Sequence, residues 1–425
     1  MVLLLFGSLL ILLLLNIPIA VSLGLSSIIA LTFGDMPTPS FVVAQRMFTS
    51  LDSFPFMAIP FFMLAGGLME RGGISVRLIK FAKACVGNTI GGLGIITIIA
   101  SAFFGAISGS NPATVAAIGG IMIPAMIKAG YPKDFASAIA AAGGTLGVII
   151  PPSIPMITYG VVAGVSISTL FTAGIVPGIL IGLSLIGVIL YYSKKLNLPK
   201  GEPTSLKNIL VTFKEAILAL LMPVIILGGI YGGVFTPTEA AAVAVIYSFI
   251  VSVFVYKELK MKDLGQVILK SAISTAVVLF VIANSASFSW IITSAQIPAK
   301  VTTAMMSLSS NPIVITTLIN IMLLFLGSFL ETQAIILLVA PILLPLTASL
   351  GISPILLGII IVVNTSVGMI TPPMAVNLFV ACGISGLKVE AISRKIIAFL
   401  VVEIIIVLLI TNFPQISLFL PQLLQ

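Results

Sequence analysis

The stretch Gly143–Pro152 (GGTLGVIIPP) interrupts apolar sequence, and a related stretch, Asn364–Pro373 (NTSVGMITPP), interrupts it again. The two double prolines lie 221 positions apart (372 − 151 = 221), as do Pro124 and Pro345. Proline removes a backbone N–H donor and glycine weakens a helix, so each stretch predicts a break in an otherwise helical segment. Matching helix breaks in two halves of a membrane protein are typical of a transporter binding site.

The composition places the chain in a membrane. Of its 425 residues, 59% are hydrophobic and 8% charged, and the mean hydropathy is +1.29. A chain this apolar is predicted to be an all-α polytopic membrane protein in contact with the lipid bilayer. The net charge of +8 comes from basic residues in short gaps between apolar runs, where they set membrane orientation, so nucleic acid is not an expected partner.

The sequence offers little chemistry for an enzyme. It contains no histidine and no P-loop, and its two cysteines, Cys85 and Cys382, are far apart. A histidine base, a bound metal beyond sodium and ATP hydrolysis are therefore not expected, and neither is an organic cofactor. An intramembrane transferase would need clustered carboxylates or histidine, so we predict that the chain is not an enzyme.

Apolar runs of suitable length predict ten spans, two of them broken by the polar stretches. The spans are expected near 1–15, 17–33, 54–69, 134–165, 170–192, 216–232, 237–256, 272–294, 354–384 and 396–413. Two further stretches, about 88–128 and 311–349, are expected to form re-entrant hairpins with polar tips. Residues 74–86 have a basic amphipathic pattern, predicted as an interfacial helix with Ile74 and Leu78 toward lipid; a solvated loop is the alternative.

The gaps between spans that contain lysine and arginine predict how the chain is oriented in the membrane and how it divides into halves. Counting spans places all of the gaps on the cytoplasmic side and both termini outside, in the periplasm. The first half (1–200) and the second (216–425) each hold five spans and one hairpin, joined by a cytoplasmic linker at 201–215. An odd number of crossings inverts the second half relative to the first. A duplication with a structural role only is the alternative.

Polar residues gather at the hairpin tips and the facing breaks. Hydroxyls, amides and carbonyls freed by glycine and proline supply oxygen ligands that suit sodium, and we predict two such sites. In the first half the predicted ligands are Ser108, Asn111, Gly143, Gly144, Thr145 and Gly147. In the second half they are Gly327, Thr332, Asn364, Thr365, Ser366 and Thr371. The alternative is that these residues only form hydrogen bonds between packed helices.

Charged residues near the spans have different expected roles. Glu331 lies at the second hairpin tip, where it would orient substrate, balance a cation, carry a proton or serve as a structural partner to a nearby hydroxyl. Glu239 follows Thr236-Pro237-Thr238 and is predicted to cap a helix. Glu403 lies within the last span, and the sequence assigns it no role. The basic candidates for an anionic substrate are Arg46, Arg71 and Lys300.

The runs Gly105–Gly120, Gly143–Pro155 and Asn364–Asn377 resemble the large membrane subunit of tripartite ATP-independent periplasmic (TRAP) transporters, over essentially the whole chain. The resemblance implies an inverted-repeat, elevator-type ion transporter fold with two re-entrant hairpins. It also implies sodium-coupled import of an organic acid, such as sialic acid, another sugar acid or a C4-dicarboxylate, across a bacterial inner membrane.

The resemblance implies partners as well. These are a soluble periplasmic substrate-binding protein and a small four-helix membrane subunit, which we do not expect within this chain. Substrate would lie between the two tips, with Ser110 and Glu331 as its contacts, since they correspond under the shift of 221. An autonomous ion-coupled carrier that needs no binding protein is the alternative function.

Overall fold

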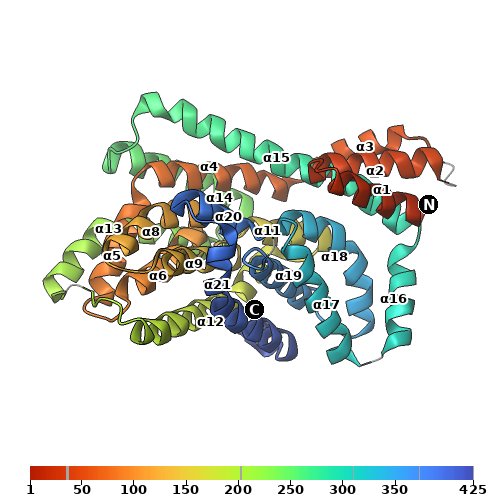
Figure 1. Cartoon of the computed structure of the whole chain (residues 1–425). Coiled ribbons are helices and arrows are strands. Elements are labelled where there is room, and N and C mark those ends of the chain that lie inside the picture. Colours follow the sequence, from red (N-terminus) through yellow and green to blue (C-terminus); the bar gives the residue numbers. More distant parts are fainter. Residues whose placement is uncertain (35–37, 202, 310, 373, 425) are drawn as a thin grey trace.

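The computed structural model describes residues 1–34, 38–201, 203–309, 311–372 and 374–424, and Pro373 of the second double proline lies outside them. The described residues are almost entirely helical (Figure 1). As far as Lys195 the helices are α1 (Val2–Leu14), α2 (Ile19–Phe33), α3 (Phe41–Leu51), η1 (Phe54–Met57), α4 (Ala58–Arg71), α5 (Ile74–Val86), α6 (Gly92–Ser108), α7 (Asn111–Thr114), η2 (Val115–Gly119), α8 (Gly120–Lys128), α9 (Lys133–Gly143), α10 (Leu146–Ile149), α11 (Ile154–Ala163) and α12 (Ile167–Lys195).

The remaining helices begin at Leu206. They are α13 (Leu206–Tyr231), α14 (Pro237–Ile250), η3 (Val251–Val255), α15 (Met261–Ser294), α16 (Ile297–Leu308), α17 (Pro312–Gly327), α18 (Thr332–Ser349), α19 (Pro354–Gly368), α20 (Val376–Ser385), α21 (Val389–Asn412) and α22 (Gln415–Leu424). Adding 221 to the first residue of α7 and the last of α8 gives Thr332 and Ser349, the two ends of α18. The repetition of prolines therefore extends to the helices around them.

The helices confirm that the chain is an all-helical polytopic membrane protein. Among the described residues, seven helices are long and apolar enough to cross a membrane, or eight if α3 and α4, bent by 70°, form one span. The predicted count of ten is not reached by this measure. Helices α1 and α2 have 13 and 15 residues, fewer than the roughly 20 that a perpendicular span needs. By contrast α18, predicted as a hairpin arm, is long enough to be a span.

The predicted breaks and tips are turns between helices. The first break separates α9, α10 and α11, and the second separates α19 from α20. At the first tip the chain leaves α6 through Gly109, whose φ of +58° favours glycine, and enters α7 after the extended Ser110. The predicted cap of α14 is also confirmed, because Thr236 and Glu239 form a reciprocal capping box.

Several helical stretches were not predicted from the sequence. They include α3, α22, the first eleven residues of α15 and the first ten residues of α13, which begins inside the predicted linker 201–215. The Ser205 side chain accepts a hydrogen bond from the Asn208 backbone N–H at 3.2 Å and so starts this helix in polar sequence. A hydrophilic composition alone does not prevent a helix when a cap and tertiary packing support it.

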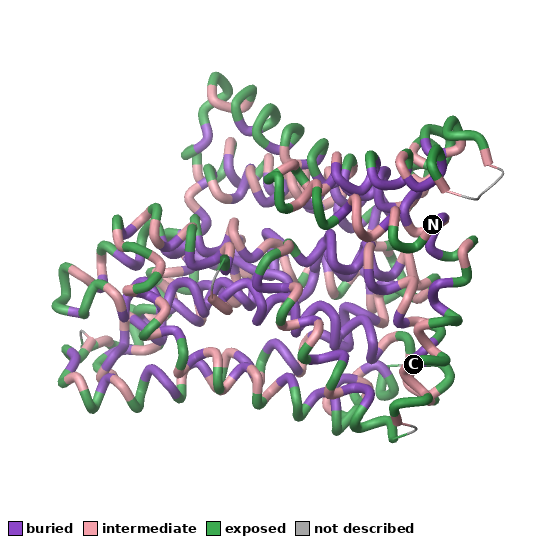
Figure 2. Tube along the Cα trace, turned by 45° about the vertical axis from the view of Figure 1, so that its right-hand side comes forward, coloured by how far each residue is buried: buried purple, intermediate pink, exposed green. Residues whose placement is uncertain are grey.

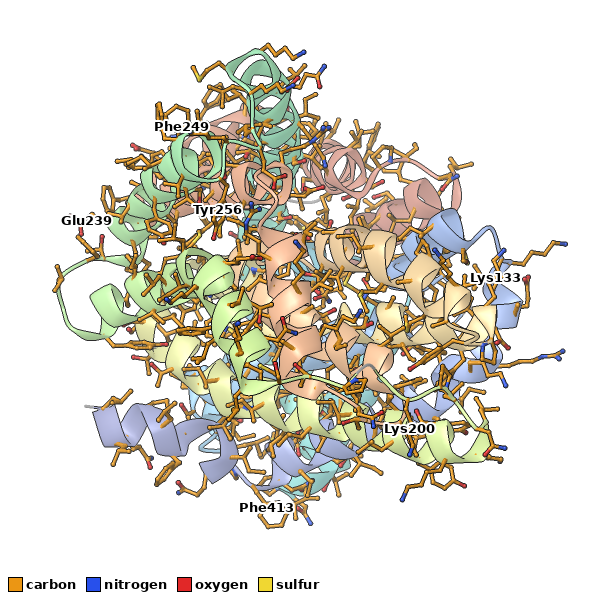
Figure 3. All side chains as sticks on the ribbon, turned by 90° about the vertical axis from the view of Figure 1, so that its left-hand side faces the viewer. Lys133, Lys200, Glu239, Phe249, Tyr256 and Phe413 are labelled. Atoms are coloured by element: carbon orange, nitrogen blue, oxygen red, sulfur yellow. The ribbon has the colours of Figure 1, made fainter. Side chains whose placement is uncertain are left out.

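The basic gaps lie together at one end of the molecule. Arg77 forms an ion pair of 2.9 Å with Glu258, Lys395 lies 4.0 Å from Asp134, and the Gly91 N–H donates to the Pro199 carbonyl at 3.3 Å. This end lies at the left of Figure 1 near α5 and α13, and Figure 3 looks onto it, with Lys133 and Lys200 labelled. The N-terminus lies toward the opposite end (Figure 1).

The helix predicted at 74–86 exists as α5, but its apolar face was wrongly assigned to lipid. Ile74, Leu78 and Ala82 are at most 1% exposed and belong to the main hydrophobic core. Helix α5 packs on α13 and α6, so protein covers the stripe that the amphipathic pattern assigned to the membrane. An apolar stripe indicates that one face of a helix is shielded from water, but it does not show whether protein or lipid covers that face.

The helices pack in two groups, which contact each other through α15 and α18. Long α15 crosses α2, α3 and α4, and α14 packs along α4. The helices with the breaks, α9 to α11 and α19, lie in the interior with the arms α6 and α18. Buried residues gather in the centre of the molecule (Figure 2). The breaks and the first tip therefore lie in the interior, where each polar atom needs a partner. At the second tip, by contrast, Glu331 is exposed.

Glycine pairs allow the hairpin arms to approach the breaks closely. A Cβ on Gly147 would lie 2.5 Å from the Ser110 carbonyl oxygen, and one on Gly368 would lie 2.5 Å from the Gly327 Cα. Real Cβ atoms do not come this close to backbone, so both positions require glycine. A glycine therefore allows close backbone contact at both places where a hairpin meets a break.

We expect Gly368→Ala to lower the free energy of unfolding by about 1–3 kcal/mol, because the added methyl group overpacks backbone against backbone. Thermal unfolding in detergent measures this change. The control is Gly383→Ala in α20, where a Cβ meets nothing within 4 Å and the helix gains propensity. Equal melting temperatures for the two variants would contradict the close approach.

Candidate functional site

The buried amide of Asn111 connects the first tip to both breaks. Asn111 is 0% exposed and begins α7. Its Oδ1 accepts a hydrogen bond from the Val148 N–H at 2.9 Å, and its Nδ2 donates to Ser366 Oγ at 2.7 Å. Nδ2 also lies 3.4 Å from the Met369 sulfur. One side chain therefore joins the hairpin tip to the end of α10 and to α19.

A second set of hydrogen bonds continues from Ser366. The Ser366 hydroxyl donates to the Thr145 carbonyl at 2.7 Å, and these two residues correspond under the shift of 221. The Thr145 hydroxyl lies 2.7 Å from the Ala142 carbonyl and 2.8 Å from Glu403 Oε1. Glu403 is 0% exposed, and its Oε2 has no hydrogen-bond partner among the described residues. The network thus runs from the tip, through both breaks, to α21.

Ser110 and Glu331 lie at one small cavity. Its volume is about 30 Å³, and Asn111, Thr332 and Met369 also line it. The sequence predicted this proximity from the shift of 221, and the structure brings both residues to the same space. Glu331, which is exposed, therefore borders the same space as the serine tip that the sequence paired with it.

The other predicted residues of the first half surround the tip. Ser108 Oγ lies 3.0 Å from Thr114 Oγ1, which donates to the Ser110 carbonyl at 2.8 Å. Gly143 packs against Ser101, and Gly144 against Val115 and Asn377. The Asn377 amide donates to the Ala141 carbonyl at 3.3 Å, while its Oδ1 has no partner among the described residues.

The predicted sodium ligands of the second half do not all lie together. Thr332 donates to the Met369 sulfur at 3.7 Å, and Gly327 packs against Thr365 and Gly368. Asn364 points elsewhere, donating to Asn320 Oδ1 at 3.0 Å in α17, and its own Oδ1 has no partner in the described part of the chain. The hydroxyls of Thr365 and Thr371 bond back to the carbonyls of Ile361 and Val367 in their own helix. Ser366 joins the first-half network instead.

A larger cavity leads from the first tip toward the basic end. It measures about 370 Å³ and lies between α4 and α15 on one side and the tip on the other. Ser108 and Ser110 line it together with Arg71, Lys270 and Glu70. Lys270 Nζ lies 3.5 Å from Glu70 Oε2, with the lysine side chain 69% exposed. Ser110 borders both this cavity and the small one.

The position of this cavity distinguishes among the three basic residues predicted as candidates for meeting an anionic substrate. Of the three predicted, Arg71 lines the cavity that reaches Ser110. Arg46 instead lies over the Trp290 ring, 5.3 Å from its centroid, and Lys300 lies on α16. Lys270 was missed because the predicted span began at 272, whereas α15 begins at Met261.

Three more residues of the site were not assigned from the sequence. Glu403 contacts the first break, Met369 contacts both tips, and Asn377 bonds to α9. The signal for Glu403 was present, since a carboxylate within a span is usually functional. The signal for Met369 was absent, because apolar residues fill most of this sequence.

We expect Glu403→Leu and Thr145→Val to be non-additive in unfolding free energy by about 1 kcal/mol, because each variant removes the same buried hydrogen bond. Melting temperatures of both single variants and of the double variant give this coupling energy. The control cycle pairs Glu403→Leu with Thr411→Val, whose hydroxyl contacts Val407 and Asn320 in place of Glu403. Additivity in the Thr145 cycle would contradict the contact.

Comparisons with known proteins agree with this architecture. Residues 6–416 match the family model "Tripartite ATP-independent periplasmic transporter, DctM component". The chain is 43% identical over 400 residues to the C4-dicarboxylate TRAP transporter large permease protein DctM of Pseudomonas aeruginosa, covering 94% of this chain and 93% of that protein. It is 38% identical to the sialic acid large permease protein SiaM of Vibrio cholerae, with 89% of each chain covered.

A third relative is longer than this chain. The isethionate permease protein DctMQ of Oleidesulfovibrio alaskensis is 44% identical over 418 residues, which are 98% of this chain and 65% of that protein. Among solved structures, the YdaH transporter of Alcanivorax borkumensis has a similar fold, with a TM-score of 0.63 at 15% identity over 87% of this chain and 86% of that one. The breaks, the tips and the near full-length matches together show that this chain belongs to the DctM large permease family of TRAP transporters, a family of membrane transporter components and not of enzymes.

Proposed function

We propose that this chain imports an organic acid together with sodium ions, by an elevator movement of the helices that carry the tips and breaks. The acid is sialic acid, another sugar acid or a C4-dicarboxylate, delivered by a periplasmic binding protein. The chain works in a bacterial inner membrane with a small four-helix subunit. The observation that carries the proposal is the position of Ser110, which borders both the tip cavity and the basic cavity.

The donor set at the breaks fits sodium. The cation sites are formed by Ser108, Asn111, Gly143, Gly144, Thr145 and Gly147 in the first half, and by Gly327, Thr332, Asn364, Thr365, Ser366 and Thr371 in the second. The buried Asn364 Oδ1 and Asn377 Oδ1 have no donor within the described residues. An amide oxygen buried without a partner is costly, and a hard cation would satisfy it. The carbonyls that end α9 add partial negative charge.

The basic cavity supports an anionic substrate. Arg71 and Lys270 face a space that ends at Ser108 and Ser110. A cleft with positive charge at its wall raises the local concentration of an anion. The relatives named above are described as permeases for C4-dicarboxylates, sialic acid and isethionate. All three solutes are organic anions, although isethionate carries a sulfonate where the other two carry carboxylates. Within this class of anions, a carboxylated solute is the substrate that we propose here. Substrate contacts Ser110 and Glu331.

The division into halves follows from the same proposal. Residues 1–200 and 216–425 form two inverted repeats, each with a re-entrant hairpin (88–128 and 311–349), and 201–215 links them in the cytoplasm. The repeated element order and the contact between the equivalent Thr145 and Ser366 support this division. The clustering of basic gaps at one end supports a cytoplasmic location for that end and periplasmic termini.

An autonomous carrier is the alternative function. The isethionate relative carries a name, DctMQ, that joins two components in one chain, which favours a system of several subunits over a permease that works alone. The autonomous carrier predicts uptake by the purified chain without a binding protein.

We expect Asn111→Ala to raise the sodium concentration needed for half-maximal uptake by roughly five- to tenfold, because it removes hydrogen bonds that hold the tip against both breaks. Uptake of a labelled acid into proteoliposomes, titrated with sodium outside, measures this. Asn412→Ala is the control, since within the described residues that exposed amide bonds only to the Leu408 carbonyl of its own helix. An unchanged sodium dependence would remove Asn111 from the coupling site.

We expect the double variant R71Q/K270Q to raise the KM for the acid by about tenfold while leaving the sodium dependence unchanged, because it removes two positive charges from the cavity wall. The same uptake assay, titrated with acid at saturating sodium, measures this. The control is K260Q/K262Q, which removes two exposed charges at the start of α15. A KM equal to that of the control would show that the cavity does not guide the anion.

A further inference from the structure

A separate cavity at the basic end lies outside the transport site. It measures about 440 Å³ and is bordered by the end of α5, the start of α6, the end of α8 and residues 199–201. Three lysines from three of these segments, Lys83, Lys128 and Lys200, line it. None of the lining residues within the described ranges is acidic. Figure 3 labels Lys200 at this end of the molecule.

The start of α6 contributes to the wall of this cavity through Leu93. This helix has 17 residues, and no side chain caps its N-terminus, because the cap position is Gly91 with φ of +72°. The first N–H groups of a helix lack intrahelical partners and carry partial positive charge. In α6 the Gly92 N–H bonds to the Thr89 carbonyl and the Gly94 N–H to the Gly91 carbonyl, each at 3.0 Å. This helix start therefore contributes partial positive charge rather than free N–H donors, and by itself it does not make a site.

Tyr131 supplies the second observation. It is 4% exposed, it lines the same cavity, and its hydroxyl has no hydrogen-bond partner among the described residues. Burial raises the pKa of this phenol, while the neighbouring backbone N–H groups of Gly94 and Leu93 lower it. The hydroxyl oxygen therefore lies against the backbone N–H groups of the first turn of α6, while its proton has no acceptor among the described residues. A buried hydroxyl with no acceptor is costly, and an anion in the cavity would accept from it.

We propose that this cavity binds a phosphate group, held by Lys128, Lys200 and the Tyr131 hydroxyl at the N-terminus of α6, with Lys83 at its wall. The ligand chemistry is that of a phosphate ester with net negative charge. It is supplied either by the headgroup of an anionic phospholipid such as phosphatidylglycerol or by soluble phosphate. The site lies at the end of the molecule where the basic gaps meet, which is where anionic headgroups are attracted.

Binding at this place would have a mechanical consequence. The cavity lies between α5 and residues 199–201 on one side and the base of the first hairpin, α6 and α8, on the other. A ligand that contacts Lys128 and Lys200 at once connects the hairpin to the segment that leads into α13. The bound phosphate therefore stabilises the arrangement described here against separation of these segments.

Native mass spectrometry of the full-length chain, stripped of lipid in detergent, tests the site. Phosphatidylglycerol is added, with zwitterionic phosphatidylcholine as the comparison lipid. We expect tight retention of one phosphatidylglycerol and affinity at least about tenfold weaker in the double variant K128Q/K200Q, which loses two charged contacts. K207Q/K214Q is the matched control, since it removes two exposed lysines from the start of α13. Tyr131→Phe, which keeps the packing, is expected to weaken binding by about fivefold.

A second experiment with inorganic phosphate shows whether the bound phosphate group comes from a lipid headgroup or from a soluble anion. Protection against thermal unfolding by phosphate alone, lost in K128Q/K200Q and kept in K207Q/K214Q, assigns the site to a soluble anion. Protection by phosphatidylglycerol only, with the same dependence on the variants, assigns it to the lipid headgroup. Equal behaviour of K128Q/K200Q, Tyr131→Phe and the control toward both ligands would overturn the proposal. Because Tyr131→Phe keeps the ring, the test stands even if the double lysine variant is poorly folded.

Discussion

The structure depends on one buried amide that both halves of the chain share. Asn111 accepts a hydrogen bond from the end of α10 and donates one to α19, and Ser366 then bonds to Thr145. Backbone broken inside a membrane protein must find internal partners. Here each break finds them partly in the other half, so the tips and breaks form one polar unit. A movement that carries this unit as a rigid body conserves the hydrogen bonds, whereas a movement within it breaks several.

A cavity extends from this polar unit toward the basic end of the molecule. Ser110 separates a small cavity beside Glu331 from a larger one with Arg71 and Lys270 on its wall. The larger cavity lies between the helices that pack along α15 and the helices of the tip. Relative sliding of these two groups would change the volume of that cavity without disturbing the amide network. In the elevator movement that we propose, this polar unit would slide against the helices that pack along α15.

The sequence predicted the membrane class, the breaks and the tips because prolines and glycines interrupt apolar runs at a fixed separation. It also paired Ser110 with Glu331, and the structure brings them to one cavity. It did not predict the direction of Asn364, which turns to Asn320, because a helix position does not reveal which neighbour a side chain meets. The role of Glu403 was missed for the same reason, since its partner Thr145 is 258 residues away. The lipid-facing assignment of α5 failed because periodicity reports burial alone.

The most direct measurement is uptake of a labelled sugar acid or C4-dicarboxylate into proteoliposomes, with sodium, the binding protein and the small subunit each omitted in turn. We expect uptake only when an inward sodium gradient and all of the protein components are present. Full uptake without the binding protein would contradict the tripartite mechanism and favour an autonomous carrier. Full uptake without sodium would contradict the sodium coupling that we propose for the oxygen-rich breaks.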